Sequence, residues 1–459
     1  MRAIPSLKIS ISGVRGIIGD SLTPSLLTRF AQAFGTYVGS GTIVIGRDTR
    51  TSGEMVRQAV VAGLLSSGCR VVDLDVCPVP TIQWMVRHLR SQGGIAITAS
   101  HNPAEWNALK FIGPEGLFLA GGQAGDLLDI YHQGEYTKVN SSEIRQVEAT
   151  SGAIDLHIKA ILDALGPLPS VSRKLRVVLD ACNGAGSIIG PRLLEALGVV
   201  AIPIHNTPDG LFPRPAEPIP ENLGILCEAV RQHHADIGFA QDMDADRLAV
   251  ISESGNPIGE ELTLVLATRY VLRREKGPVV VNLSTTQAIE AVAARFGCPV
   301  FRTRIGEANV TEGMKREKAV IGGEGNGGVI YPRINFARDS HVGMALILHL
   351  LVESQRPLSS LLSEFPSYQM VKEKLECPSD KIRGVLNLIR AQYANYSLDL
   401  RDGVKVKVEG GWFHVRGSNT EPIIRLVAEG ESTEILNRIR TTVFQQVRDY
   451  LLTQVQPVP

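Results

Sequence analysis

One hydrophobic pattern occurs three times along the chain, and it constrains the fold more than any other feature of the sequence. Each copy has a short apolar strand, an amphipathic helix that ends at a glycine, and a second apolar strand, which is the order of a βαβ unit. The copies occupy residues 42–74, 175–204 and 278–303, with helix-ending glycines Gly68, Gly198 and Gly297. The uneven spacing of these glycines does not fit a short-period solenoid. The sequence therefore predicts three separate α/β domains of a similar plan.

The last ninety residues follow a different order. Val404–Val408, Trp412–Val415 and Ile423–Glu429 have the composition of strands, and an amphipathic helix follows them, with Ile435 and Ile439 on its apolar face. Strands followed by a helix predict a small α+β domain. The fold class is thus three similar mixed α/β domains and a smaller α+β C-terminal domain, with predicted boundaries at 1–152, 153–255, 256–366 and 367–459.

Composition excludes several classes of protein. Lysine plus arginine number 47 and aspartate plus glutamate number 47, so no net charge attracts nucleic acid or an anionic membrane. An anionic substrate must therefore be held by local basic residues. The six cysteines are scattered and are expected to be reduced. With no signal peptide and no apolar run of about 20 residues, we expect a cytoplasmic protein.

A serine and a turn follow a predicted strand near residue 100. Ile95–Ala99 is apolar, and Ser100-His101-Asn102-Pro103 follows it. Because Asn-Pro favours a turn, the Ser100 hydroxyl is expected at the tip of a loop, where reactive groups are commonly held. For a lone serine, a local hydrogen bond within the turn is the simpler explanation. The Gly-x-Ser-x-Gly motif of α/β-hydrolases is absent here, which disfavours an esterase.

Three aspartates, Asp242, Asp244 and Asp246, alternate in a loop between two apolar strands. Carboxylates in such an arrangement can converge on one hard cation, so the loop predicts a metal site. An EF-hand is excluded because its sixth loop position requires glycine, and Arg247 stands there. Three acids beside an arginine suit Mg²⁺ that shares a phosphate oxygen.

Two further loops carry groups that suit a sugar phosphate. The glycine-rich turn 322–328 contains Glu324 and Asn326 but neither a Walker A motif nor a dinucleotide fingerprint, which disfavours ATP and NAD. Its carboxylate and amide could contact sugar hydroxyls, and a purely structural hairpin turn is an equal alternative. The loop 416–422 offers one guanidinium, two hydroxyls and an amide, a set suited to a phosphate monoester or to an ordinary β-turn.

Taken together and in this order, the motifs resemble those of the α-D-phosphohexomutase superfamily. The resemblance covers essentially the whole chain and depends most on Thr98–Pro103 and Asp242–Arg247. It implies four successive domains around a central cleft, which contribute in turn a phosphoserine loop, a magnesium loop, a sugar-binding loop and a phosphate-binding loop. The implied reaction interconverts hexose 6-phosphate and hexose 1-phosphate through a phosphoserine enzyme and a hexose 1,6-bisphosphate.

The same resemblance implies a role for each candidate residue. Ser100 would be the phosphorylated nucleophile and would hold Mg²⁺ together with Asp242, Asp244 and Asp246. Basic groups beside the transferred phosphoryl group would be Arg15, His101, Lys110 and Arg247, with Lys110 as the general acid/base. Groups that bind the substrate would be Glu324 and Asn326 at the sugar, and Arg416, Ser418, Asn419 and Thr420 at the distal phosphate.

The sequence also departs from the family pattern. Many members have serine where Asn326 stands and a catalytic-site histidine where Gly328 stands, so the role of that histidine is unassigned here. The turn Ile305-Gly306-Glu307 resembles that of phosphoglucosamine mutases, which makes glucosamine phosphate the expected substrate. Phosphomannomutase or phosphoglucomutase activity is the alternative. A metal-dependent sugar phosphatase and a non-catalytic phosphosugar-binding protein also stay open, and the sequence predicts no oligomeric state.

Overall fold

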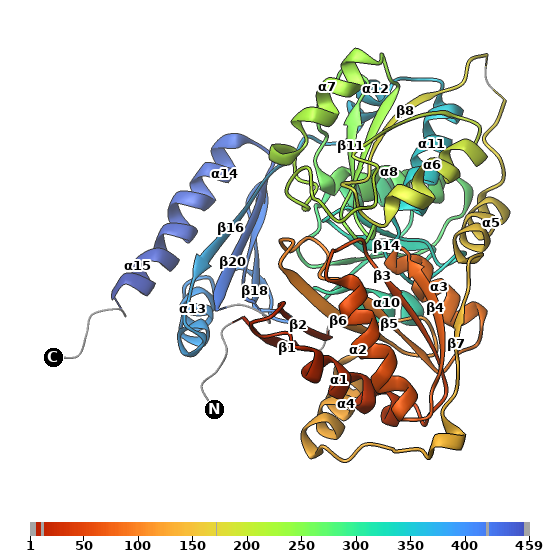
Figure 1. Cartoon of the computed structure of the whole chain (residues 1–459). Coiled ribbons are helices and arrows are strands. Elements are labelled where there is room, and N and C mark those ends of the chain that lie inside the picture. The colour runs from red at the N-terminus through yellow and green to blue at the C-terminus, as the bar shows by residue number, and fades with distance from the viewer. Residues whose placement is uncertain (1–5, 11–12, 171, 419–421, 454–459) are drawn as a thin grey trace.

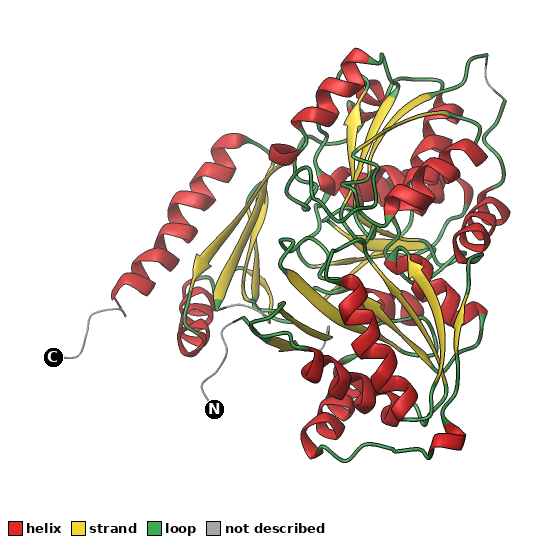
Figure 2. Ribbon diagram, in the orientation of Figure 1, coloured by secondary structure: helices red, strands yellow, loops and turns green. Residues whose placement is uncertain are grey.

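A computed structural model describes residues 6–10, 13–170, 172–418 and 422–453. The chain forms four β-sheets in succession, each packed against helices (Figures 1 and 2). Three are mixed sheets that belong to α/β units, and the fourth is antiparallel, which confirms the predicted fold class. The boundaries at 152, 255 and 366 stay predictions. No described helix has the length and apolar character needed to cross a bilayer.

The first sheet has seven strands in the order β1-β2-β6-β5-β3-β4-β7. The strands are β1 (Lys8–Ser10), β2 (Gly13–Ile17), β3 (Thr42–Arg47), β4 (Arg70–Val76), β5 (Gly93–Ile97), β6 (Trp106–Ile112) and β7 (Val147–Ala149). The helices are α1 (Pro24–Tyr37), α2 (Gly53–Ser66), α3 (Val79–His88) and α4 (Gly121–Gln133). The predicted βαβ unit is confirmed, because α2 connects the parallel strands β3 and β4. Gly68 has a φ of +77°, the left-handed conformation that commonly ends a helix.

The second and third sheets share one plan. Each has three parallel strands and one antiparallel edge strand, in the orders β11-β10-β8-β9 and β13-β12-β14-β15. The strands are β8 (Arg176–Asp180), β9 (Val200–Ile204), β10 (Ile237–Gln241), β11 (Leu248–Ser252), β12 (Val279–Asn282), β13 (Val300–Thr303), β14 (Ile321–Glu324) and β15 (Gly328–Ile330). The helices are α5 (Ala153–Leu165), α6 (Gly186–Ala196), α7 (Gly224–Gln232), α8 (Glu260–Arg274), α9 (Ala288–Arg295), α10 (Glu307–Glu317), α11 (Ser340–Ser354) and α12 (Leu358–Leu362).

The second and third sheets bury a common core. Leu179 and Phe239 of the second sheet belong to the same apolar cluster as Val281 of the third, and α8 and α11 contribute residues to it. The shared core fixes the loops of these two sheets relative to each other, because close-packed interiors resist displacement.

The C-terminal sheet is antiparallel, in the order β16-β20-β19-β18-β17. Its strands are β16 (Gln369–Glu376), β17 (Ser397–Asp399), β18 (Val404–Val408), β19 (Gly411–Gly417) and β20 (Ile423–Gly430). Its helices are α13 (Ser379–Gln392), α14 (Thr433–Ile439) and α15 (Gln445–Thr453), the last two joined by the π-helical turn Arg440–Phe444. The three predicted strands and the predicted helix are confirmed, whereas β16, β17 and α13 were not predicted. The helices cover one face of the sheet, and His414 and Glu429 on the other face bond Ser284 and Thr286 of the third α/β unit.

Candidate active site

The candidate loops occupy equivalent places in the four sheets. Each connects two antiparallel neighbours: β5 to β6 for the serine loop, β10 to β11 for the aspartate loop, β14 to β15 for the glycine-rich loop and β19 to β20 for the Arg416 loop. In the first three sheets the first strand of each pair also lies beside a parallel strand. Ligands of α/β sheets bind beyond the carboxyl ends of such strands. The three α/β sheets therefore present their loops at the edge where binding is expected.

The serine loop holds Ser100 in a strained and buried position. Ser100 is only 3% exposed, and its φ of +49° lies in the left-handed region that non-glycine residues rarely adopt. Its backbone amide donates to Thr98 Oγ1 at 2.9 Å, and its hydroxyl donates to Asp242 Oδ2 at 2.8 Å. The hydroxyl therefore lies in a turn, as predicted, but points into the aspartate loop and away from solvent.

Sequence reasoning missed the residue that holds this loop in place. Arg50 is fully buried, and its guanidinium donates to the carbonyl oxygens of Ser100, Asn102, Pro103 and Trp106. Its Nε also pairs with Asp48 Oδ2 at 3.0 Å. Four fixed acceptors on one planar group restrict the loop more than any local turn could. No local signal marks Arg50, because its acceptors are backbone atoms about 50 residues away.

The three aspartates converge as predicted. Asp242, Asp244 and Asp246 are at most 1% exposed, and one carboxylate oxygen from each lies within 4.8 Å of the others. Asp244 Oδ1 and Asp246 Oδ1 are buried and accept no hydrogen bond from the described residues. Burial, together with the neighbouring carboxylates Asp244 and Asp246, raises the pKa of Asp242 well above its usual value. Buried oxygens that lack protein donors and repel one another fit a divalent cation.

Two cations flank this cluster. Lys110, on β6, is 6% exposed and places Nζ 2.8 Å from Asp244 Oδ2. Although burial alone would raise the pKa of Asp244, Lys110 holds that pKa below its usual value. Arg247 Nε lies 3.7 Å from Asp246 Oδ1 and 3.9 Å from Asp242 Oδ2. Lys110 and Arg247 therefore both lie at the aspartate cluster.

The two remaining basic candidates contact the serine loop. His101 Nδ1 lies 3.4 Å from Ser100 Oγ, and the charge of Arg247, followed by burial and Arg15, lowers the pKa of His101 well below its usual value. A neutral imidazole offers one hydrogen-bond donor and one acceptor nitrogen beside Ser100. Arg15 donates to Asn102 Oδ1 at 2.6 Å. The structure thus brings all five basic or nucleophilic candidates of the first two domains to one place.

The glycine-rich loop positions Glu324 through three donors. Glu324 Oε1 accepts from Asn282 Nδ2 and from the Gly306 amide, both at 2.9 Å, and Oε2 accepts from Arg338 at 2.8 Å. Asn326 Oδ1 accepts from the Gly328 amide at 3.3 Å. A sugar hydroxyl at Glu324 would therefore meet a carboxylate whose orientation is already fixed. Arg338 is a second residue that sequence reasoning missed.

A cavity of about 170 Å³ lies between the glycine-rich loop and the C-terminal sheet. Glu324, Asn326 and Arg416 all line it, so the structure brings these three candidates together. Ser418 is described and donates its amide to the Ile423 carbonyl at 2.9 Å. Asn419 and Thr420 lie outside the described residues.

The cavity wall carries more positive charge than the Arg416 loop alone. Arg425 on β20 is paired in register with Lys374 on β16 and with Arg416 on β19, and all three line the cavity. Arg425 alternates along its strand with the core residues Ile424 and Leu426, so it faces away from the helices. Three basic side chains on adjacent strands can attract an anion, and the carboxylates of Glu261, Glu324 and Glu373 line the same cavity.

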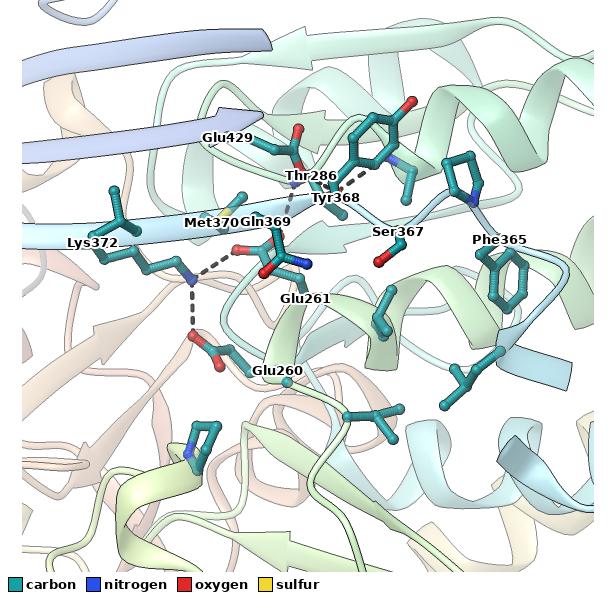
Figure 3. A pocket seen from close by; sticks show the side chains of 18 of the residues that line it. Glu260, Glu261, Thr286, Phe365, Ser367, Tyr368, Gln369, Met370, Lys372 and Glu429 are labelled. Carbon is teal, nitrogen blue, oxygen red and sulfur yellow. Dashed lines mark hydrogen bonds and ion pairs between the residues drawn. The ribbon is translucent and has the colours of Figure 1, made fainter. Parts of the chain in front are cut away.

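Lys372 holds the C-terminal sheet beside the glycine-rich loop. Lys372 on β16 pairs with Glu260 Oε1 at 2.9 Å and Glu261 Oε1 at 2.7 Å, at the start of α8 (Figure 3). Its Nζ also donates to the Gly325 carbonyl at 3.3 Å. These contacts border a larger cavity of about 690 Å³, which Tyr368 and Glu429 also line (Figure 3). The fourth sheet is thus held at the third, next to the loop that carries Glu324.

Comparisons with known proteins agree with this arrangement. Models of the phosphoglucomutase/phosphomannomutase family match the chain over residues 7–138 (alpha/beta/alpha domain I), 155–255 (domain II), 259–368 (domain III) and 371–446 (C-terminal domain). A Methanopyrus kandleri protein named "Probable phosphoglucosamine mutase" is 39% identical over 95% of this chain and 97% of its own length. A "Phosphoglucomutase/phosphomannomutase" of Thermococcus kodakarensis is 37% identical over 92% and 94%.

The fold agrees as well. The crystal structure of a phosphoglucomutase/phosphomannomutase family protein from Burkholderia thailandensis superposes with a TM-score of 0.84 at 26% identity, over 96% of this chain and 97% of that one. Family models match all four units in order, and relatives more than 30% identical cover nearly the whole chain. The chain therefore belongs to the phosphoglucomutase/phosphomannomutase family of phosphohexomutases.

Proposed function

We propose that the protein interconverts hexose 6-phosphate and hexose 1-phosphate, with glucosamine phosphate as the preferred substrate. One observation carries this proposal: the buried Ser100 hydroxyl donates a hydrogen bond to Asp242, which belongs to a cluster of three carboxylates. The name of the Methanopyrus relative and the Ile305-Gly306-Glu307 turn favour glucosamine, whereas the name of the Thermococcus relative supports glucose and mannose as alternatives.

In the proposed reaction, phosphorylated Ser100 is the donor. The bond between phosphorus and Ser100 Oγ breaks as a bond to the sugar hydroxyl oxygen forms, so the sugar loses a proton and Ser100 Oγ gains one. Lys110, buried against Asp244, is the residue that we assign to this proton transfer. Mg²⁺ held by Asp242, Asp244, Asp246 and the phosphoserine would supply positive charge to the phosphoryl oxygens. Arg247 would add fixed positive charge on the same side.

The second half-reaction requires the sugar to turn around. The hexose 1,6-bisphosphate formed first must place its other phosphate at Ser100, which then regains a phosphoryl group, so no phosphate is consumed. At each stage one phosphate lies at Ser100 and the other needs a second anion site. Arg416, Arg425 and Lys374 form the site that we assign to it.

One experiment separates this proposal from its alternatives. Intact mass of the purified protein, before and after hexose 1,6-bisphosphate, reports whether a phosphate adduct forms on Ser100. Turnover is then compared on glucosamine, glucose and mannose 6-phosphates. A mutase gives the 1-phosphate, a phosphatase gives inorganic phosphate, and a binding protein gives neither. Release of inorganic phosphate as the main product would overturn the mutase proposal.

Arg416→Ala tests the distal phosphate site. Removing a guanidinium that binds the non-reacting phosphate should lower kcat/KM for hexose phosphates roughly 10- to 100-fold, as expected for a hydrogen bond to a charged group of about 1.5–3 kcal/mol. The bisphosphate should also escape before its second transfer, so the phosphoserine is lost during turnover. Steady-state kinetics with and without added bisphosphate, together with intact mass, measure both effects.

The matched control is Arg390→Ala, an exposed arginine on α13 of the same domain. It should retain wild-type kinetics. Wild-type kinetics and an undiminished phosphoserine in Arg416→Ala would show that the distal phosphate is held elsewhere.

A further inference from the structure

Arg338 connects three functional segments through one buried guanidinium. Its Nη2 lies 2.5 Å from Asp246 Oδ2 in the aspartate loop, and its Nη1 lies 2.8 Å from Glu324 Oε2 at the glycine-rich loop. Its Nε lies 2.9 Å from Glu307 Oε2, at the start of α10. The side chain is 11% exposed. Each of the three guanidinium nitrogens therefore pairs with a different carboxylate.

The two ends of this connection matter for different ligands. Asp246 Oδ2 accepts from Arg338, whereas Asp246 Oδ1 accepts no hydrogen bond from the described residues and lies beside Asp242 and Asp244. Glu324 gives Oε2 to Arg338, and lines the cavity that also holds Arg416. Partners that orient a metal-binding carboxylate affect metal affinity, because they set its direction and basicity. The Arg338 side chain thus orients both Asp246, the carboxylate that we assign to a cation, and Glu324, the carboxylate that we assign to the sugar.

Gly328 is matched to this arrangement. A Cβ atom at position 328 would lie 2.3 Å from Arg338 Cδ and 2.9 Å from its Cγ, closer than real Cβ contacts. The φ of Gly328 is not in the left-handed region, so the backbone itself would accept another residue. The stem of Arg338 therefore fills the space that any side chain at position 328 would need.

We propose that Arg338 is a positioning residue that fixes Asp246 and Glu324 relative to each other. Arg338 does so without contacting the substrate, by neutralising part of the charge of three buried carboxylates that would otherwise repel one another. The inference rests on the proposed function, since it assigns Asp246 to a cation and Glu324 to the sugar. It predicts that cation binding and sugar binding weaken together when Arg338 is lost.

The test compares Arg338→Met, Arg338→Lys and wild-type protein. Titration calorimetry with Mg²⁺ on unphosphorylated protein should show roughly tenfold or greater loss of affinity in Arg338→Met, the range typical of residues that orient metal ligands. The KM for hexose phosphate should rise and kcat should fall in the same variant. Arg338→Lys should recover part of both, because one ammonium keeps the charge but cannot bind three carboxylates.

The matched control is Arg57→Met. Arg57 pairs with the buried Asp73 in the first domain, outside the candidate site, so its loss should lower stability without changing Mg²⁺ affinity or KM. Unchanged Mg²⁺ affinity and KM in folded Arg338→Met would overturn the proposal, even if that variant were less stable. Because calorimetry needs no turnover, an inactive wild-type protein would count against the proposed function and leave this test intact.

Gly328→Ala provides an independent perturbation if Arg338→Met does not fold. Its single added methyl group must displace Arg338, so Mg²⁺ affinity should fall and KM should rise. Wild-type affinity and KM in Gly328→Ala would overturn the proposal, whether or not a variant of Arg338 folds. Where Arg338→Ala folds, the same methyl group meets no Arg338 stem there and should add no further loss, and equal losses in both backgrounds would overturn the proposal as well.

Discussion

Ser100→Ala should lower turnover of hexose phosphates by roughly a thousandfold or more, because the variant lacks the atom that carries the phosphoryl group. No phosphate adduct should appear in its intact mass after incubation with hexose 1,6-bisphosphate. The protein should remain folded, since the lost hydrogen bond to Asp242 is worth only about 1 kcal/mol and Arg50 holds the loop through backbone carbonyls. Turnover, intact mass and thermal unfolding together measure these outcomes.

Ser252→Ala is the matched control for this prediction. Ser252 is as buried as Ser100, lies on β11 of the second domain and hydrogen-bonds Ser254 and Asn256 outside the candidate site. Its alanine variant should lose a similar amount of stability and keep its activity and its phosphate adduct. If Ser100→Ala retained more than a few hundredths of wild-type turnover, the phosphoserine mechanism would be wrong.

Periodicity predicted those parts of the fold whose strands and helices are local and regular. The three βαβ units and the strands β18, β19 and β20 follow from apolar alternation and helix-ending glycines. The strand β16 was missed because its outward residues include the charged Lys372 and Lys374. Lys372 pairs with Glu260, and Lys374 lies opposite Arg425 on β20, and both neighbours are distant in the sequence. The common core of the second and third sheets was missed for a related reason. The hydrophobic pattern predicts which face of a helix or strand is buried, but it does not predict which domain packs against that face.

The candidate site shows the same division. Motifs singled out Ser100, the three aspartates and Glu324 as candidates, because each lies in a short loop or at the strand end that leads into one. Arg50 and Arg338 were missed because each acts through acceptors that are distant in the sequence. Lys110 was assigned to the site by resemblance alone, and the antiparallel pairing of β5 with β6 explains its position: Lys110 lies opposite Ala96, near the end of the strand that leads to Ser100.

Asp244→Asn, and removal of the metal from the wild-type protein, should each lower turnover about as much as Ser100→Ala does. The substitution removes a charged oxygen from the cluster of three aspartates and leaves Lys110 without its carboxylate partner. Mg²⁺ affinity should therefore fall by more than the roughly 10- to 100-fold typical for residues that only orient metal ligands. Activity of the wild-type protein should disappear in excess EDTA and return with Mg²⁺.

Thermal unfolding provides a readout that does not depend on catalysis. A ligand that binds only the folded state adds about 2.7 kcal/mol to the free energy of unfolding at 100 times its Kd, so Mg²⁺ should raise the Tm of the wild-type protein. The same Mg²⁺ concentration should leave the Tm of Asp244→Asn nearly unchanged. Asp73→Asn, a buried aspartate paired with Arg57 in the first domain, is the control and should keep the full Mg²⁺ response. Full activity in EDTA, or a Tm of Asp244→Asn that rises with Mg²⁺ as the wild type does, would show that the three buried carboxylates have a structural role, and the metal-assisted transfer proposed for Ser100 would have to be abandoned.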